Sequence, residues 1–122
     1  MTLIEAVRSI LVKGKIKNVF IVDAPVPGEC VLITPYASQT HEGAEVSENK
    51  FQIKCAAASF IQSEDLAWKV FDLLEGKYVP SCDRVTLGSV YSLQEPFFIG
   101  KDENNRYIQA FNIAVNAVWK ER

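Results

Sequence analysis

Apolar residues recur at the spacing of an α-helix near the start of the chain, over residues 3–13. They form one stripe, made of Leu3, Val7, Ile10 and Leu11. Thr2 and Glu5 have the spacing of a capping box, in which each side chain accepts a hydrogen bond from the backbone N–H of the other residue. Gly14 can adopt the left-handed conformation that ends many helices. The pattern predicts a capped helix with one buried face.

A second helical pattern covers residues 64–75, where Ser63 is placed to cap the first turn. Its buried stripe is Leu66, Val70, Phe71 and Leu74. Trp68 and Leu73 fall elsewhere around the helix, which predicts that it is covered on more than one side. Gly76 follows the helix and supplies the stop signal.

Strand patterns, rich in β-branched and aromatic residues, occupy much of the remaining chain. The predicted strands are residues 19–22, 30–34, 51–57, 84–88, 96–100 and 106–119. In the last of these, alternate residues from Tyr107 to Trp119 share one face. The other face is apolar except for Asn112 and Asn116, which indicates a surface that is covered but not fully dry.

The resulting order of elements is α-β-β-β-α-β-β-β. It predicts an α+β fold with a mainly antiparallel sheet and two helices packed on one face. The length of 122 residues, without linkers or repeats, predicts a single domain over residues 1–122. Apolar residues point to both faces of the sheet, as the adjacent Phe97 and Phe98 must, and this indicates self-association or a partner.

Two polar segments interrupt the pattern. Residues 37–49 have almost no apolar periodicity and predict a long acidic loop, of a length that is uncommon in compact domains and is usually functional or mobile. Two interpretations stay open for this loop: it is a disordered loop in solvent, or it is an arm that becomes ordered against a partner. Residues 101–105 have the composition of a hairpin turn, because asparagine tolerates positive φ.

Charge and composition exclude several classes of protein. The net charge of −2 predicts no strong attraction to nucleic acid or anionic lipid. No apolar run approaches the roughly 20 residues of a membrane span, and the N-terminus lacks a signal-peptide pattern. We therefore expect the protein to stay in the cytoplasm in which it is made. The three scattered cysteines predict free buried thiols and no zinc site.

Candidate catalytic groups are few. His41 is the single histidine and stands in the polar loop with no residue that would orient it. Glu64 and Asp65 suit the positive end of a helix, and residues 102–105 lack the alternation of a calcium loop. Lys13, Lys15 and Lys17 form only a weak nucleic-acid signal. The sequence predicts no catalytic, cofactor or metal site.

Residues 96–107, Pro-Phe-Phe-Ile-Gly-Lys-Asp-Glu-Asn-Asn-Arg-Tyr, are followed by Phe-Asn-Ile at 111–113. This segment resembles the C-terminal signature of the tail terminators of long-tailed phages, a family also called minor capsid proteins. The N-terminal layout is similar too, although residues 35–38 stand where the family has a glycine.

The resemblance implies a structural virion protein that is not an enzyme. Such terminators form hexameric rings on the finished tail tube, stop its polymerisation and join the tail to the head. The implied partners are further copies of the chain, the tail tube protein and the head-tail connector protein, with DNA passing through the lumen without sequence-specific binding. The implied location is the head-proximal end of the tail in the virion, after assembly in the host cytoplasm.

The polar segments are the predicted contacts with other subunits and partners. The contact residues are His41, Glu42, Glu45 and Glu48 of the first segment, and Lys101, Asp102, Glu103, Asn104, Asn105 and Arg106 of the second. Arg106 and Tyr107 match the family signature. We expect both to fix the turn or the strand pairing rather than to touch DNA.

Other functions stay open. A different head-tail completion or connector protein would have a similar small α+β plan. A ligand-binding α+β domain would have a pocket between sheet and helices and would be a stable monomer or dimer. An enzyme would need His41, or a carboxylate pair such as Glu64 and Asp65, to converge in a cleft.

Overall fold

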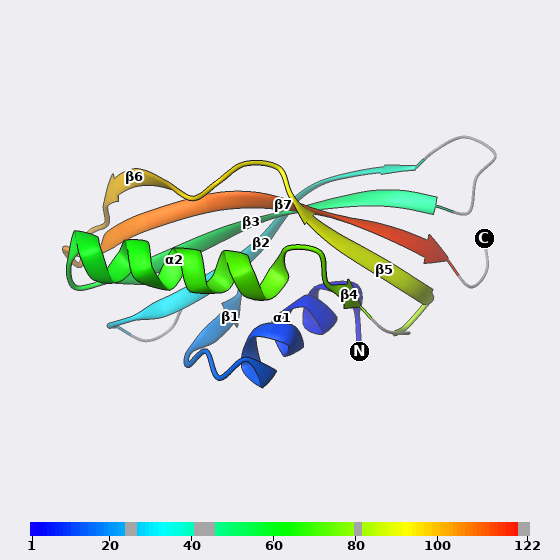
Figure 1. Ribbon diagram of the computed structural model, residues 1–122, viewed down its shortest axis with the longest axis horizontal. Coiled ribbons are helices and arrows are strands. Elements are labelled where there is room, and N and C mark those ends of the chain that lie inside the picture. The colour runs from blue at the N-terminus through cyan, green and yellow to red at the C-terminus, as the bar shows by residue number, and fades with distance from the viewer. Residues whose placement is uncertain (24–26, 41–45, 80–81, 120–122) are drawn as a thin grey trace.

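The computed structural model describes residues 1–23, 27–40, 46–79 and 82–119. Within these ranges the chain forms two helices and seven strands (Figure 1). In chain order they are α1 (Leu3–Lys13), β1 (Val19–Ile21), β2 (Cys30–Thr40), β3 (Val46–Ala57), α2 (Phe60–Leu74), β4 (Tyr78–Val79), β5 (Val85–Ser92), β6 (Phe97–Lys101) and β7 (Tyr107–Trp119). The predicted α+β class is confirmed, and the two-residue strand β4 is an element that the sequence pattern did not predict.

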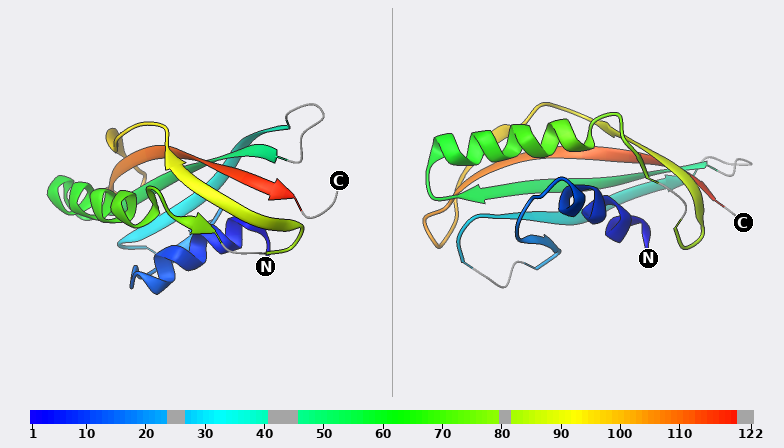
Figure 2. Two further views of the ribbon diagram at one scale, coloured as in Figure 1. Left: turned by 45° about the vertical axis from the view of Figure 1, so that its right-hand side comes forward. Right: turned by 60° about the horizontal axis from the view of Figure 1, so that its bottom comes forward.

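The strands form one curled sheet in the order β1-β2-β3-β7-β5-β4, and β6 pairs with β7 outside this path (Figure 2). Strand β1 runs parallel to β2, whereas the other pairs are antiparallel. The sheet is therefore mixed rather than purely antiparallel. Strand β7 is long enough to pair with β6 along its first half and with β5 along its second half.

Helix α1 begins and ends where the sequence predicts. The backbone N–H of Thr2 donates to Glu5 Oε1 at 2.9 Å, and the backbone N–H of Glu5 donates to Thr2 Oγ1 at 3.4 Å, which completes the capping box. The prediction that Gly14 adopts the left-handed conformation is wrong: its φ is −78°, and the next residue, Lys15, has the positive φ of 67°. Gly14 lies close to helix α2: a Cβ there would lie 2.6 Å from Leu73 Cδ1, so the Leu73 side chain would have to shift.

Helix α2 starts four residues before the predicted first residue. Its N-cap is Ser59, whose Oγ accepts a hydrogen bond from the backbone N–H of Gln62 at 3.2 Å. Ser63, the predicted cap, is buried inside the helix and donates from Oγ to the Phe60 carbonyl at 2.7 Å. Glu64 consequently lies in the second turn, away from the positive helix end that its charge was expected to suit.

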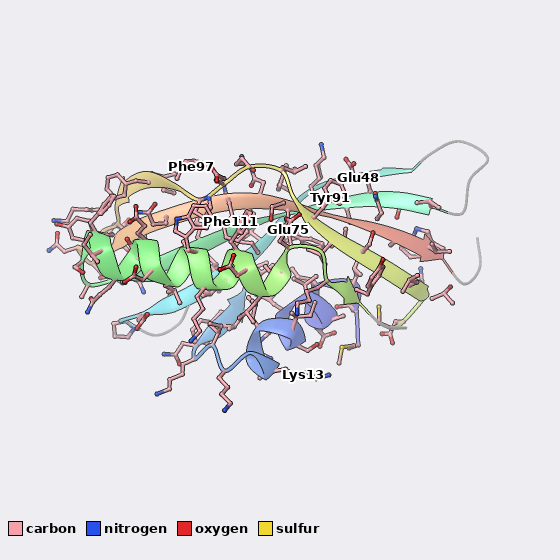
Figure 3. All side chains as sticks on the ribbon, viewed as in Figure 1. Lys13, Glu48, Glu75, Tyr91, Phe97 and Phe111 are labelled. Atoms are coloured by element: carbon pink, nitrogen blue, oxygen red, sulfur yellow. The ribbon has the colours of Figure 1, made fainter. Side chains whose placement is uncertain are left out.

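The core lies between the sheet and both helices. Its largest fully buried side chains include Phe111, Ile113, Leu11 and Leu74, so one apolar cluster contains residues from β7 and from each helix. Figure 3 shows Phe111 between the sheet and α2. The predicted alternation of β7 and the packing of both helices on one face are confirmed.

Candidate functional site

The first predicted contact segment is mostly strand, so the prediction of a long loop over residues 37–49 is wrong. Strand β2 continues to Thr40 and β3 begins at Val46, and the two pair in register from Ala37↔Lys50 to Thr40↔Ser47. Strand β3 also pairs with the second half of β7. These ladders satisfy the backbone groups without requiring an apolar side-chain pattern, which is why sequence periodicity missed them. His41, Glu42 and Glu45 lie outside the described residues.

Polar side chains fix the far end of this β2–β3 ribbon, near the pair Thr40↔Ser47. Trp119 Nε1 donates to Ser47 Oγ at 2.6 Å, and Asn49 Nδ2 donates to the same oxygen at 3.0 Å. Ser47 is buried, with 2% of its surface exposed. The hydrogen bonds join the ribbon to the end of β7, so the described part of the ribbon belongs to the sheet along its whole length.

Glu48 is the one described residue of the first contact set, and it lies on the face of the sheet opposite the helices. Its Oε2 accepts a hydrogen bond from Tyr91 Oη at 2.6 Å, and its Oε1 lies 3.5 Å from Lys50 Nζ. Figure 3 shows Glu48 and Tyr91 beside each other. The hydrogen bond to Glu48, together with burial, raises the pKa of Tyr91 to about 12. Glu48 therefore links β3 to β5 across β7.

The second contact segment is the predicted tight turn between β6 and β7. Asp102 Oδ1 accepts hydrogen bonds from the backbone N–H groups of Asn104 and Arg106, at 3.0 and 2.9 Å. Asn105 adopts a positive φ of 58°, as expected for asparagine in a turn. Burial alone would raise the pKa of Asp102, but the hydrogen bonds from Arg106 and Asn104 outweigh it and lower that pKa.

Arg106 connects this turn to a distant loop. Its Nε donates to Asp102 Oδ2 at 2.8 Å, and its Nη1 donates to the Gly28 carbonyl at 3.0 Å and contacts Cys30 Sγ at 3.4 Å. The side chain is only 15% exposed. This geometry agrees with the expectation that Arg106 fixes the turn. The exposed positions of the segment are Lys101, Glu103, Asn104 and Asn105.

The two predicted contact segments lie at opposite ends of the molecule. The β6–β7 turn is at one end of the long axis and the β2–β3 ribbon reaches toward the other (Figure 1). The structure therefore does not bring the two sets together into one site. It gives the molecule two chemically different ends, joined by β7 and its neighbours.

A third surface was not among the predicted contact residues. Six large apolar side chains, each at least 37% exposed, lie on α2 and on β6: Phe60, Ile61, Trp68, Phe97, Phe98 and Ile99. The rings of Phe60 and Phe98 meet edge to face, with centroids 5.2 Å apart. Phe97 and Ile99 lie on the open face of β6 and Phe98 on its helix face, so these side chains wrap around the edge of the sheet. We call this surface the β6 flank. Adjacent Phe97 and Phe98, and Trp68 outside the buried stripe of its helix, were its sequence signals, whereas Phe60 and Ile61 were placed before the helix.

The described residues hold no group of three or more His, Cys, Asp and Glu side chains that could bind a metal ion. Cys30, Cys55 and Cys82 are buried thiols, as predicted, and burial raises the pKa of Cys55 well above its ordinary value. Across the part of the chain that the structure describes, neither helix is long and apolar enough to cross a bilayer.

The open face of the sheet carries a hollow of about 300 Å³ beside the β6–β7 turn. Its lining includes Leu32, Lys54, Ile99 and Ile108. The hollow lies on the face away from the helices, whereas the ligand-binding alternative requires a pocket between helices and sheet. Cys30, Asp102 and Arg106 also line the hollow, so its lining mixes apolar side chains with charged ones of both signs.

Comparison with known proteins places this fold among virion proteins. The sequence model described as bacteriophage tail terminator protein matches residues 10–119. The chain is similar to a chain of the virion of a native gene transfer agent (GTA) particle, with a TM-score of 0.76 at 17% identity, over 94% of this chain and 93% of the other. A search of the curated proteins gives no match. Because the family match covers nearly the whole chain, the protein belongs to the bacteriophage tail terminator family.

Proposed function

We propose that this phage tail structural protein forms a ring, most simply a hexamer, that caps the finished tail tube, stops its polymerisation and joins the tail to the head-tail connector. The observation that carries the proposal is the family match over residues 10–119. The fold shared with a chain of a virion particle supports it. The chain acts as a structural component and catalyses no reaction.

The arrangement of the two ends supports a joint between different partners. The exposed residues of the β6–β7 turn are Lys101, Glu103, Asn104 and Asn105, while the β2–β3 ribbon reaches toward the opposite end. In the sequence, His41, Glu42 and Glu45 stand between these two strands. In a ring of parallel subunits, equivalent ends collect on the same rim. One rim would then contact the tail tube protein and the other the head connector.

The ring would stand at the head-proximal end of the tail, after assembly in the host cytoplasm. DNA would pass through its lumen without sequence-specific contacts. The net charge of −2 is compatible with this passage, because it gives no general attraction to phosphate.

Tube length provides the test. Tail tube protein is polymerised with and without the purified chain, and the lengths are measured by electron microscopy. The proposed terminator shortens or fixes the tube length and appears as a cap at one end. Light scattering after size exclusion measures the mass of the chain alone. Tubes of unchanged length with no cap would contradict the proposed function.

A further inference from the structure

The β6 flank matches in size the largest apolar patch that a typical monomer exposes, and such patches are often functional. The six side chains of the β6 flank are 37–63% exposed. Because a whole aromatic side chain has a surface of about 200 Å², the six together expose roughly 450 Å² of apolar surface. That area is more than half of the ~800 Å² that each partner buries in a standard interface. Two carboxylates accompany these side chains. Glu64 follows Phe60 by one helical turn, and Glu95 precedes β6.

A second surface with the opposite chemistry lies at the other edge of the same sheet. Lys15, Lys17 and Lys69 border a groove of about 280 Å³ together with Asn18 and the acidic Glu29, and the buried side chains of Ile16 and Leu66 also line it. All three lysines are exposed, and within the described residues none of them forms an ion pair. We call this surface the β1 flank, because it adjoins the edge strand β1.

The positions of the two flanks suit a side-by-side contact between copies. Strands β1 and β6 border opposite edges of the sheet at the same end, since Cys30 pairs with Ala56, Ala56 with Ile108 and Ile108 with Gly100 (Figure 1). Helix α2 contributes Phe60 to one flank and Lys69 to the other. Two different surfaces on opposite sides of one subunit produce a heterologous contact, which closes into a ring if the rotation permits.

The chemistry of the flanks also favours a second copy as the occupant. Lysine ammonium groups bind the faces of aromatic rings, as Lys101 Nζ does within this chain at 4.9 Å from the Tyr107 ring centre. Lysine stems cover apolar surface while their charges meet carboxylates. A contact of the β6 flank with itself would instead bring Glu64 against Glu64 or Glu95, so an isologous dimer is disfavoured.

We propose that the β6 flank of each subunit docks on the β1 flank of the next, with Phe60 and Phe98 at the groove and Glu64 and Glu95 facing Lys17 and Lys69. The proposal rests on the ring of the proposed function and names the surfaces that build it.

Charge reversal in the full chain tests the contact. One variant carries Lys17→Glu and Lys69→Glu, and the other carries Glu64→Lys and Glu95→Lys. Each variant alone brings like charges together at every contact, so its assembly midpoint shifts to at least about tenfold higher concentration. An equimolar mixture restores both attractive contacts in an alternating ring. Light scattering after size exclusion measures both results, and thermal unfolding verifies that each variant is folded.

The matched control reverses two exposed basic residues outside both flanks, Lys77→Glu and Arg84→Glu, and assembles as the original chain does. If the chain forms rings and both flank variants form them equally well, the proposed contact is wrong while the ring remains. If variants assemble normally but no longer cap tail tubes, the flanks contact the tube protein instead and the proposal is overturned. If the original chain stays monomeric even on tail tubes, the contact and the proposed ring both fail.

Discussion

The two faces of strand β7 differ in side-chain size more than in polarity. On the helix side, Phe111, Ile113 and Val115 are fully buried in the main core. On the open side, Ala110 and Ala114 alternate with Asn112 and Asn116, and both alanines are also fully buried. No helix covers them. The long side chains of neighbouring strands lie over this face, among them Lys54 and Tyr91.

The burial of these alanines shows that an apolar sheet face without helices can be covered by side chains of the sheet itself, with no partner over it. Apolar residues on both faces of β7 do not require a partner over the open face, because small residues there are covered by the side chains of the same sheet. The exposed apolar area collects instead at the β6 flank, where Phe97 and Phe98 belong to an edge strand with one neighbour. The exposed apolar surface therefore indicates an interface at the β6 edge of the sheet rather than over its open face.

The largest loss of stability is expected from a substitution on the helix side of β7. Phe111→Ala removes a fully buried ring that contacts Phe71 edge to face, with centroids 5.6 Å apart. The lost transfer energy and the cavity should reduce the free energy of unfolding by about 3–5 kcal/mol, measured by urea denaturation. Phe97→Ala deletes the same ring from a side chain that is 42% exposed, and its loss should be about 1 kcal/mol. Equal losses would contradict the asymmetry of the sheet.

An intermediate loss of stability is expected at the β6–β7 turn, where Arg106 forms hydrogen bonds to Asp102 and to the Gly28 carbonyl. Arg106→Ala removes the hydrogen bonds to Asp102 and to the Gly28 carbonyl, and the free energy of unfolding should fall by about 2 kcal/mol. Arg106→Lys keeps the charge but not the planar fork, so it should recover less than half of the loss. Glu103→Ala, an exposed position of the same turn, is the control. A full recovery with lysine would show that charge alone matters.

The smallest effect is expected at the polar link on the open side. Tyr91→Phe removes the 2.6 Å hydrogen bond to Glu48 and should reduce stability by about 1 kcal/mol at neutral pH. The raised pKa means that the protonated phenol is favoured in the folded state. Its stabilisation is therefore complete below the ordinary pKa of about 10 and is lost as pH rises to the folded value of about 12.

Denaturation at several pH values checks this prediction, through the difference between the original chain and Tyr91→Phe. The difference should shrink and reverse between pH 10 and about 12. Lys54→Ala, on the same face without a comparable hydrogen bond, should change stability by no more than about 0.5 kcal/mol. A difference between the original chain and Tyr91→Phe that stays constant across this range would mean that Tyr91 titrates as an ordinary tyrosine.

Short-range signals predicted much of the fold. Thr2 and Glu5 predicted the start of α1, and the alternation from Tyr107 to Trp119 predicted which side of β7 enters the core. Such signals depend on neighbours in the chain, namely capping bonds and side-chain periodicity. They failed at α2, because Ser63 and Ser59 are equally good caps in isolation. Packing decided between them by burying Ser63.

Long-range pairing accounts for most of what was missed. Residues 46–49 have little strand signal of their own, yet Ser47 and Glu48 pair with β2 on one side and with β7 on the other. The parallel β1 and the short β4 are likewise set by the neighbouring strands rather than by their own composition. The predicted contact residue Arg106 has a partner, Gly28, at a sequence separation of 78 residues, and no spacing rule indicates it.

The sequence by itself determined which face of each helix is buried, how side chains alternate along β7, the turn before Arg106 and the resemblance to tail terminators. Each of these depends on residues that are close together in the chain. Only the tertiary structure decided how far the β2–β3 ribbon extends and where the exposed aromatic residues gather. It also placed Lys17 and Phe97 on opposite edges of one sheet. Those properties depend on which strands become neighbours, and strand order arises from burying the whole apolar pattern at once rather than from any local segment.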